Sequence, residues 1–244
     1  MTPQTTFTFL TWNLCLMQNS DDAPAGWRVD QTESKVREFI LEHDPDFVFF
    51  QELPGLVPYV ETHDLIPANT KSHSGNIATI VRKELMDELE SKTIGGFAVV
   101  SRIKSAGLTF ANVHLEAGKG GDYKRLESLN RIVNECESPS LVIAGDTNTR
   151  VEEEESLKTI GLLGKRPPKP TWNSNVNHFR SHGRKFSSYY TRYFHNDSAK
   201  ISKVKVWDQP FEHDSSKFYL SDHFALSAQV SIVGDVSKST ETKE

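Results

Sequence analysis

The chain has 244 residues, enough for one large domain or two small ones, and its 36% hydrophobic and 25% charged residues are typical of a soluble globular protein. It contains no run of about 18 apolar residues, so no membrane-spanning helix is expected. The opening sequence MTPQTTFTFL lacks the basic and apolar regions of a signal peptide, and we expect an intracellular protein, cytoplasmic or nuclear. A net charge of -5 argues against general affinity for nucleic acid.

Strand-like apolar runs dominate the chain, and two amphipathic segments interrupt them. In chain order we predict a strand at Phe7–Leu16, a helix at Gln31–His43, strands at Phe47–Gln51, Ile77–Arg82, Phe97–Ile103 and Leu108–His114, a helix at Tyr123–Glu137, and strands at Leu141–Ala144, Tyr189–His195 and Phe224–Val233. This order, without strict alternation of strands and helices, predicts an α+β fold. Two packed, mostly antiparallel β-sheets flanked by helices would form a four-layer α/β/β/α sandwich.

No internal repeat or composition change divides the sequence. We therefore expect residues 1–233 to form a single domain. Residues 234–244 are polar and aperiodic, which predicts a disordered tail. Cys15 and Cys136 lie in apolar segments without a partner at short spacing, so core thiols are expected rather than a disulfide or a zinc site.

The charge is unevenly distributed, because no Asp or Glu occurs between Ser156 and Asn196. The cations of this basic segment are Lys158, Lys165, Arg166, Lys169, Arg180, Arg184, Lys185 and Arg192. The aromatic residues among them are Trp172, Phe179, Phe186, Tyr189 and Tyr190. Aromatic faces stack on bases while cations hold phosphates, so the segment is predicted to bind nucleic acid. The alternative is a solvated charged loop.

Five short polar signatures each stand at the end of a predicted strand. They are Thr11-Trp12-Asn13, Gln51-Glu52, His114-Leu115-Glu116, Gly145-Asp146-Thr147-Asn148 and Ser221-Asp222-His223. Each is weak evidence alone, but the set supplies carboxylates and carboxamides, the oxygen ligands that suit Mg²⁺ or Mn²⁺. It also supplies two imidazoles that could face a phosphate. The strand ends are therefore predicted to form one metal-dependent site.

The same ordered motifs define the endonuclease/exonuclease/phosphatase superfamily, which the chain resembles from about Phe7 to Val233. The Gly-Asp-Thr-Asn-x-Arg form at 145–150, with Pro-Thr-Trp at 170–172 and Ser-Asp-His-Phe at 221–224, is most similar to the 5'-tyrosyl-DNA phosphodiesterase branch. Inositol-polyphosphate 5-phosphatases share a similar Gly-Asp-x-Asn-x-Arg element, and deadenylases and sphingomyelinases share the outer motifs.

The resemblance implies a Mg²⁺-dependent phosphodiesterase that hydrolyses phosphodiester bonds at the 5' ends of DNA. Removal of a tyrosyl adduct of the topoisomerase kind, as in DNA repair, is the candidate reaction. The alternatives are a phosphoinositide 5-phosphatase, a deadenylase or a general nuclease, and a catalytically impaired nucleic-acid-binding protein. The implied partner is single-stranded DNA at its 5' end, with no membrane partner, and we expect a monomer.

The resemblance also implies roles for the strand-end residues. Glu52, with Asn13 and Asp222, would hold one Mg²⁺, for which Mn²⁺ is the alternative. Asp146, oriented by Asn148, would activate or align the attacking water.

Two imidazoles, those of His223 and His114, would donate hydrogen bonds to the phosphate oxygens in the transition state. Asn13 belongs to the catalytic group as well as to the metal site. The predicted substrate contacts are Arg150, Trp172, Lys119, Arg180, Arg184 and Lys185, with Arg150 near the phosphate and Trp172 along the groove for single-stranded DNA.

Two positions depart from the family pattern. Thr191 stands where the family carries an Asp that would orient and charge the catalytic imidazole. A hydroxyl can bond the ring but cannot stabilise an imidazolium as an anion does, and Asp197 or Asp208 might substitute. Ala117 replaces a family Ser, which removes one phosphate donor, and Lys119 falls where a basic residue is expected.

Overall fold

The computed structural model describes residues 5–18, 22–55, 57–66, 70–72, 75–136, 138–177, 179 and 185–233. The predicted tail, residues 234–244, lies outside the described residues. Within the described part of the chain, no helix combines the length and the apolar character needed to cross a membrane. Both cysteines are free and buried, as predicted.

Two large sheets form the centre of the molecule. The seven-stranded sheet has the order β14-β17-β1-β2-β5-β3, with β4 paired to β5, and the six-stranded sheet has the order β10-β13-β9-β8-β7-β6. Each sheet contains one parallel pair, β1 with β2 and β8 with β9, while its other pairs are antiparallel. This arrangement confirms the prediction of two mostly antiparallel sheets.

The strand bounds locate the polar strand ends within these sheets. The first sheet contains β1 (Thr6–Asn13), β2 (Phe47–Leu53), β3 (His63–Leu65), β4 (Thr70–Ser72), β5 (Gly75–Arg82), β14 (Ala199–Trp207) and β17 (Ala225–Ile232). The second contains β6 (Leu89–Ile94), β7 (Ala98–Ile103), β8 (Leu108–His114), β9 (Ser140–Asp146), β10 (Leu163–Lys165) and β13 (Thr191–His195). Two small hairpins are formed by β11 (Trp172–Asn173) with β12 (Ser187–Ser188), and by β15 (Phe211–His213) with β16 (Ser216–Phe218).

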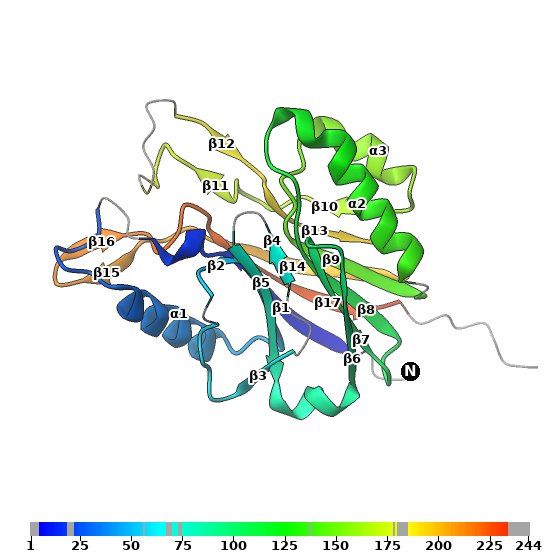
Figure 1. Ribbon diagram of the computed structural model, residues 1–244, viewed down its shortest axis with the longest axis horizontal. Coiled ribbons are helices and arrows are strands. Elements are labelled where there is room, and N and C mark those ends of the chain that lie inside the picture. The colour runs from blue at the N-terminus through cyan, green and yellow to red at the C-terminus, as the bar shows by residue number, and fades with distance from the viewer. Residues whose placement is uncertain are drawn as a thin grey trace, which may run out of the picture.

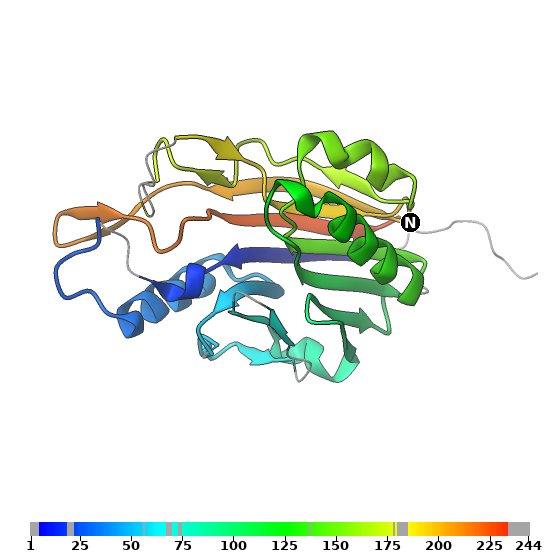
Figure 2. The same ribbon diagram turned by 45° about the horizontal axis from the view of Figure 1, so that its top comes forward.

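Helices cover the outer faces of both sheets (Figures 1 and 2). Helix α1 (Val29–His43) covers the seven-stranded sheet, and α2 (Asp122–Glu135) and α3 (Glu154–Lys158) cover the six-stranded sheet. Short 3-10 turns are η1 (Cys15–Met17), η2 (Lys83–Glu88), η3 (Lys119–Gly121) and η4 (Val151–Glu153). The four layers follow the predicted order of helix, sheet, sheet and helix.

Aromatic side chains fill the space between the sheets. Phe9 and Phe47 stack with ring centroids 4.8 Å apart, and Phe47 meets Phe110 of the facing sheet at 4.5 Å. On each strand these residues alternate with others that face outward, such as Leu10 and Val48, which pack beneath α1. Burial of this apolar surface stabilises the sandwich and fixes which strand faces point inward.

A buried polar bridge joins the two sheets close to the ends of β2 and β8. Gln51 Nε2 donates to Asn112 Oδ1 at 2.7 Å, and Asn112 Nδ2 donates to the carbonyl oxygen of Ala78 at 2.8 Å. Thr11 also bonds the Gln51 amide, at 3.1 Å. A fully bonded buried network permits one relative placement of its strands, because any shift would leave polar groups unpaired.

Some elements differ from their predicted bounds. The first strand ends at Asn13 rather than Leu16, because Cys15, Leu16 and Met17 turn away with positive φ angles. The nine-residue strand β14 was not predicted at all. A bulge at Lys203 interrupts its alternation of apolar and polar residues, which hides the strand from a period-two search.

A buried histidine contributes to the pH response of the fold. His63 on β3 is 3% exposed, and its Nε2 lies 2.7 Å from the carbonyl oxygen of Pro45. Its Nδ1 lies 2.9 Å from Thr62 Oγ1. These partners are satisfied by the neutral ring, and burial lowers the pKa of His63 below its usual value.

We predict that His63 makes the protein less stable under mildly acidic conditions. The unfolded chain takes up the proton first, near pH 6.5, so the free energy of unfolding should fall as the pH drops from there toward the lowered folded pKa. Chemical denaturation of wild type and His63→Gln between pH 5 and 8 would measure this, at roughly 1.4 kcal/mol per pK unit of difference. An equal pH slope in both proteins would refute the assignment.

Candidate active site

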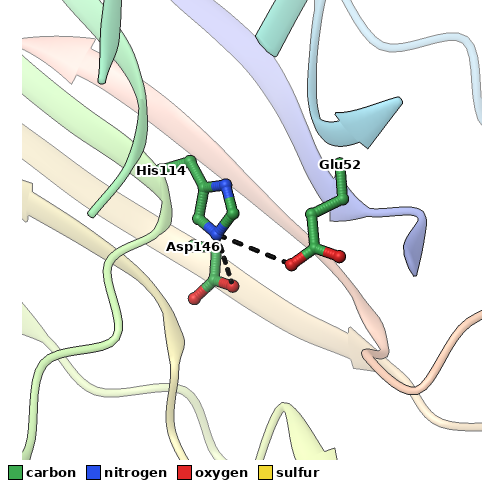
Figure 3. A group of neighbouring side chains, drawn as sticks. All are labelled: Glu52, His114 and Asp146. Atoms are coloured by element: carbon green, nitrogen blue, oxygen red, sulfur yellow. Dashed lines mark ion pairs between the residues drawn. The ribbon is translucent and has the colours of Figure 1, made fainter. Parts of the chain in front are cut away.

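Three strand ends bring Glu52, His114 and Asp146 together. Glu52 lies near the end of β2, and His114 and Asp146 end the parallel neighbours β8 and β9. His114 Nε2 lies 3.6 Å from Glu52 Oε1 and 3.6 Å from Asp146 Oδ2 (Figure 3). Among the described residues, this is the one group of His, Cys, Asp and Glu whose ligand atoms all lie within 4.8 Å of one another.

Asn13 holds the two carboxylates from the end of β1. Its Nδ2 donates to Glu52 Oε1 at 3.0 Å and to Asp146 Oδ2 at 2.8 Å. Its Oδ1 accepts the backbone N–H of Cys15 at 2.9 Å, so the oxygen expected to face a metal is engaged elsewhere. Asp222, the third expected ligand, lies outside the cluster, and its carboxylate is 3.5 Å from Ser221 Oγ.

The donor set fits a divalent cation. Two carboxylates face each other across a small gap, and such a pair is stabilised when a positive charge lies between them. Glu52 and Asp146 offer the hard oxygens that Mg²⁺ and Mn²⁺ prefer, and the imidazole of His114 is better tolerated by Mn²⁺ than by Mg²⁺.

Backbone geometry aims the acidic side chains. Glu52 and Asn148 both have left-handed backbones, with φ of 52° and 49°. Such strain in non-glycine residues persists only where the surrounding structure imposes it, and it concentrates at functional sites. The Asn148 N–H donates to Asp146 Oδ1 at 3.2 Å, which fits the expected orienting role. Gly145 allows β9 to approach β8, because a Cβ there would lie 2.1 Å from the Val113 carbonyl oxygen.

His223 also approaches the carboxylate of Asp146. Its Nε2 lies 3.7 Å from Asp146 Oδ2, and its Nδ1 lies 3.2 Å from Thr191 Oγ1. The Thr191 hydroxyl therefore contacts the ring nitrogen that an orienting carboxylate was expected to face. Neither candidate substitute contacts the ring: Asp208 pairs with Lys169 at 2.7 Å, and Asp197 lines a cavity at the opposite end of the sandwich.

A row of aromatic rings leads away from His223. Phe186 and Trp172 stack with centroids 4.3 Å apart, Tyr190 lies 6.3 Å from Trp172, and His223 lies 6.3 Å from Tyr190. Trp172 also forms a β-bridge with His223. Trp172 thus lies beside the site as predicted, and Tyr190, although noticed within the basic segment, was not expected to link Trp172 to the histidine.

The basic segment is less positive than its sequence suggests. Four of its cations are paired: Lys158 with Glu155, Arg166 and Arg192 with Glu154, and Lys169 with Asp208. Lys185 forms no ion pair with any described residue, and Arg180 and Arg184 lie outside the described residues. Of the cations of this segment expected to contact the substrate, only Lys185 is therefore among the described residues. Lys165 also forms no ion pair with a described residue, and the nucleic-acid contact itself stays a prediction.

Lys119 and Arg150 line a cavity of about 410 Å³ formed by the segments that follow β8 and β9. The rest of its lining is mixed: Tyr123, Leu126 and Leu157, the acidic residues Asp122, Glu152 and Glu153, and Ser156. The Arg150 Nε is buried and has no hydrogen-bond partner among the described residues. Arg150 reaches this cavity two residues beyond Asn148.

Sequence reasoning missed the residue that joins the loops around this cavity. Arg125 on α2 is fully buried, and its Nη1 donates to the carbonyl oxygens of Glu116 and Gly118, each at 2.9 Å. Its Nε donates to Glu153 at 2.9 Å, and Glu153 also accepts the N–H of Arg150 at 3.2 Å. An arginine in an amphipathic helix normally lies on the solvated face, so no sequence signal distinguished it.

Comparison with known proteins identifies relatives of this architecture. A model of the Endonuclease/Exonuclease/phosphatase family matches residues 10–224. No curated protein matches the chain. Solved structures with the same fold include TDP2 from D. rerio complexed with single strand DNA product (TM-score 0.67, 16% identity, 93% of this chain and 99% of that chain).

Two further structures have the same fold. They are TDP2 from C. elegans (TM-score 0.66, 16% identity, 93% of this chain and 75% of that chain) and an endonuclease/exonuclease/phosphatase family protein from Bacteroides thetaiotaomicron (TM-score 0.69, 16% identity, 94% and 96%). At this level of identity the likeness shows the fold, while the chemistry of the site depends on this chain's own residues.

We predict that the contact between Thr191 and His223 supports turnover. Thr191→Val removes the hydroxyl with little change in volume and should lower kcat by on the order of tenfold or more, because the ring loses the partner that orients it. Thr191→Ser should retain most of the rate. Thr191→Asp should raise the rate, since no other described carboxylate contacts Nδ1 and an anion would favour the charged ring. Equal rates in all four proteins would show that the contact has no catalytic effect.

Proposed function

Because the chain belongs to the endonuclease/exonuclease/phosphatase family, we propose that it is a Mg²⁺-dependent phosphodiesterase that hydrolyses phosphodiester bonds at the 5' ends of DNA. The observation that carries this proposal is the pairing of Glu52 and Asp146 beside two imidazoles, with a row of aromatic rings leading away from one of them. Paired carboxylates can bind a divalent cation, and the neighbouring imidazoles can donate hydrogen bonds to a phosphate. The aromatic rings can stack on bases.

The proposed cation site contains Glu52 as its principal ligand. A cation held there would polarise a phosphate oxygen and stabilise the departing oxygen. Asn13 orients the Glu52 carboxylate through its amide N–H, and Asp222 would contribute from the adjoining loop through a water molecule. This assignment gives Asn13 a positioning role rather than direct coordination, and Mn²⁺ remains the alternative ion.

Asp146 is proposed to accept a proton from the attacking water. Its carboxylate is fixed by the Asn148 N–H at one oxygen and by Asn13 at the other. The water oxygen bonds to phosphorus as the bond from phosphorus to the leaving oxygen breaks, and the leaving oxygen later takes a proton from solvent. His223 and His114 would donate to the non-bridging oxygens, where negative charge accumulates.

The aromatic row is the proposed wall for the bases at a single-stranded 5' end. Phe186 is 43% exposed and stacks on Trp172, so a base could extend the stack on its free face. The D. rerio TDP2 structure holds a single-stranded DNA product, and we extend that substrate class to this chain. A tyrosyl group is the proposed leaving group, and we propose that Arg150 and Lys119 bind near the phosphate.

A substrate panel with and without metal tests this function. We expect Mg²⁺-dependent release of 5'-phosphotyrosine from single-stranded DNA to exceed turnover of abasic duplex, poly(A) and phosphoinositide, and EDTA should abolish it. Faster turnover of another panel member would move the protein to that branch of the family. Turnover that persisted in EDTA would remove the metal from the mechanism.

Two variants separate the roles of the carboxylates within the same prediction. Glu52→Gln removes the principal ligand and should weaken Mg²⁺ binding strongly and lower the rate. Asp146→Asn removes only the second negative charge, so it should weaken Mg²⁺ binding less than Glu52→Gln and still stop the reaction. Calorimetric titration of metal into each variant measures the first effect, and single-turnover kinetics measure the second. Equal loss of metal affinity in both variants would contradict this division.

We predict that Trp172 contributes to binding of single-stranded DNA. Stacking on one base is worth about 1–3 kcal/mol, so Trp172→Ala should weaken binding by roughly 5- to 150-fold. Trp172→Phe retains a ring and should lose much less. Fluorescence anisotropy with a labelled oligonucleotide in EDTA isolates binding from cleavage. If the Ala and Phe variants bind alike, the aromatic row does not contact bases.

A further inference from the structure

Three lysines share one outer face of the edge strand β14. Lys200, Lys203 and Lys205 are exposed, and none forms an ion pair with a residue that the structure describes. Lys200 lies opposite Ser231 and Lys205 opposite Ser227 on the neighbouring strand β17. Directly opposed residues of an antiparallel pair project from the same face, so each of these two lysines is accompanied by a hydroxyl.

A strained bulge brings the lysines at the two ends of the row onto one face. The register between β14 and β17 shifts between Ser202 and Lys205, and Lys203 has a left-handed φ of 48°. In a regular strand, Lys203 and Lys205 would share one face and Lys200 would project from the opposite one. The extra residue shifts this alternation, so that Lys200 and Lys205 both lie opposite serines of β17, and Lys203 lines the same groove as Lys205.

The groove between these lysines and α1 has a volume of about 200 Å³. Lys205 Nζ lies 3.3 Å from the centroid of the Trp207 ring, and His43 stacks on the same ring with centroids 4.0 Å apart. The Trp207 indole N–H donates to Ser227 Oγ at 2.9 Å. Gln229 supplies an amide to the same lining.

We propose that this lysine face, formed by Lys200, Lys203 and Lys205 with Ser227 and Gln229, binds the phosphate backbone of a nucleic acid. Phosphate contacts in such complexes come from Lys together with Ser and Gln side chains, and they carry no sequence information. The chain as a whole is acidic, with a net charge of -5, so a row of unpaired cations on it is a local feature. Charge complementarity therefore selects a polyanion.

The composition of the face favours nucleic acid over a lipid surface. Membrane-surface binding needs exposed apolar side chains beside the cations. None of the large hydrophobic side chains found exposed in the described structure lies on β1, β14 or β17. The row of lysines, hydroxyls and an amide offers hydrogen bonds and charge, and the apolar residues beside it in the groove, Leu10, Pro45 and Trp207, are buried or half-buried.

The lysine face is separate from the catalytic edge but connected to it along one strand pair. Trp207 at the end of β14 pairs with Ala225, two residues beyond His223. From there β14 runs away from the catalytic strand ends to Lys200 at the edge of the sheet (Figure 1). The choice of nucleic acid as occupant rests on the proposed function, in which the site takes a 5' end and this face would hold a more distant part of the same molecule.

Lysines and a bulge on an edge strand also discourage pairing with another sheet. If the lysines only prevent sheet pairing, the protein should self-associate when they are removed. If they bind nucleic acid, the variant should lose duplex binding and stay monodisperse. The experiment therefore measures both. It compares the triple variant Lys200→Gln, Lys203→Gln, Lys205→Gln with a control that changes Lys83, Lys92 and Lys104 to Gln, which removes the same charge elsewhere.

Binding of a labelled 30-base-pair duplex is measured by anisotropy in EDTA over a range of salt concentrations, with size-exclusion chromatography of each protein. The triple variant should bind on the order of tenfold more weakly than the control, and the slope of log K against log salt should become shallower by about 0.9 per lost contact. A variant with Arg at all three positions should bind as wild type does. That variant also guards against a folding failure in the Gln protein.

Affinity and slope equal to those of the control would overturn the proposal, as would self-association of the triple variant without loss of duplex binding. Loss of binding to anionic vesicles alone would also overturn it and assign the face to lipid headgroups. Cleavage of a short 5'-phosphotyrosyl trinucleotide tests the proposed function separately. If wild type does not cleave this substrate, the proposed function is refuted. The anisotropy measurement would still show whether the lysine face binds nucleic acid.

Discussion

The fold must hold two carboxylates from different sheets, those of Glu52 and Asp146, within a few ångströms of each other at one end of the sandwich. Glu52 comes from the seven-stranded sheet and Asp146 from the six-stranded sheet, and their repulsion opposes the packing of the layers. Asn13 donates to both carboxylates, and His114 approaches both. A cation between the carboxylates would relieve this repulsion, and the rest of the fold has to keep the two sheets in register for the pair.

That register comes from contacts immediately below the site. The amides of Gln51 and Asn112 join the sheets one residue from Glu52 and two residues from His114. On the other side, the missing side chain of Gly145 allows β9 to lie against β8, so that Asp146 ends level with His114. Rigid strands thus place the functional groups, and left-handed backbones at the strand ends aim them.

The sequence predicted the layers and the strand ends well, because both depend on local patterns. Apolar runs marked most strands of the two sheets, and polar signatures marked the ends where Glu52, His114 and Asp146 meet. It could not predict long-range pairings. The charge of the basic segment is largely neutralised by acidic residues outside it, such as Glu154 and Asp208. Strand β14 was not predicted because its bulge shifts the alternation of apolar and polar residues. The orientation of the Asn13 amide was not predicted either, because it depends on a hydrogen bond from the backbone of Cys15.

The buried guanidinium of Arg125 connects the segment after β8 with the segment after β9, through the carbonyl oxygens of Glu116 and Gly118 and the carboxylate of Glu153. Opening either segment would leave a charge in the protein interior without its partners, which costs several kcal/mol. The two segments therefore open together or remain closed together. Local unfolding around Lys119 and Arg150 is thus a single cooperative event, and their backbone amides would exchange hydrogen with a common free energy of opening.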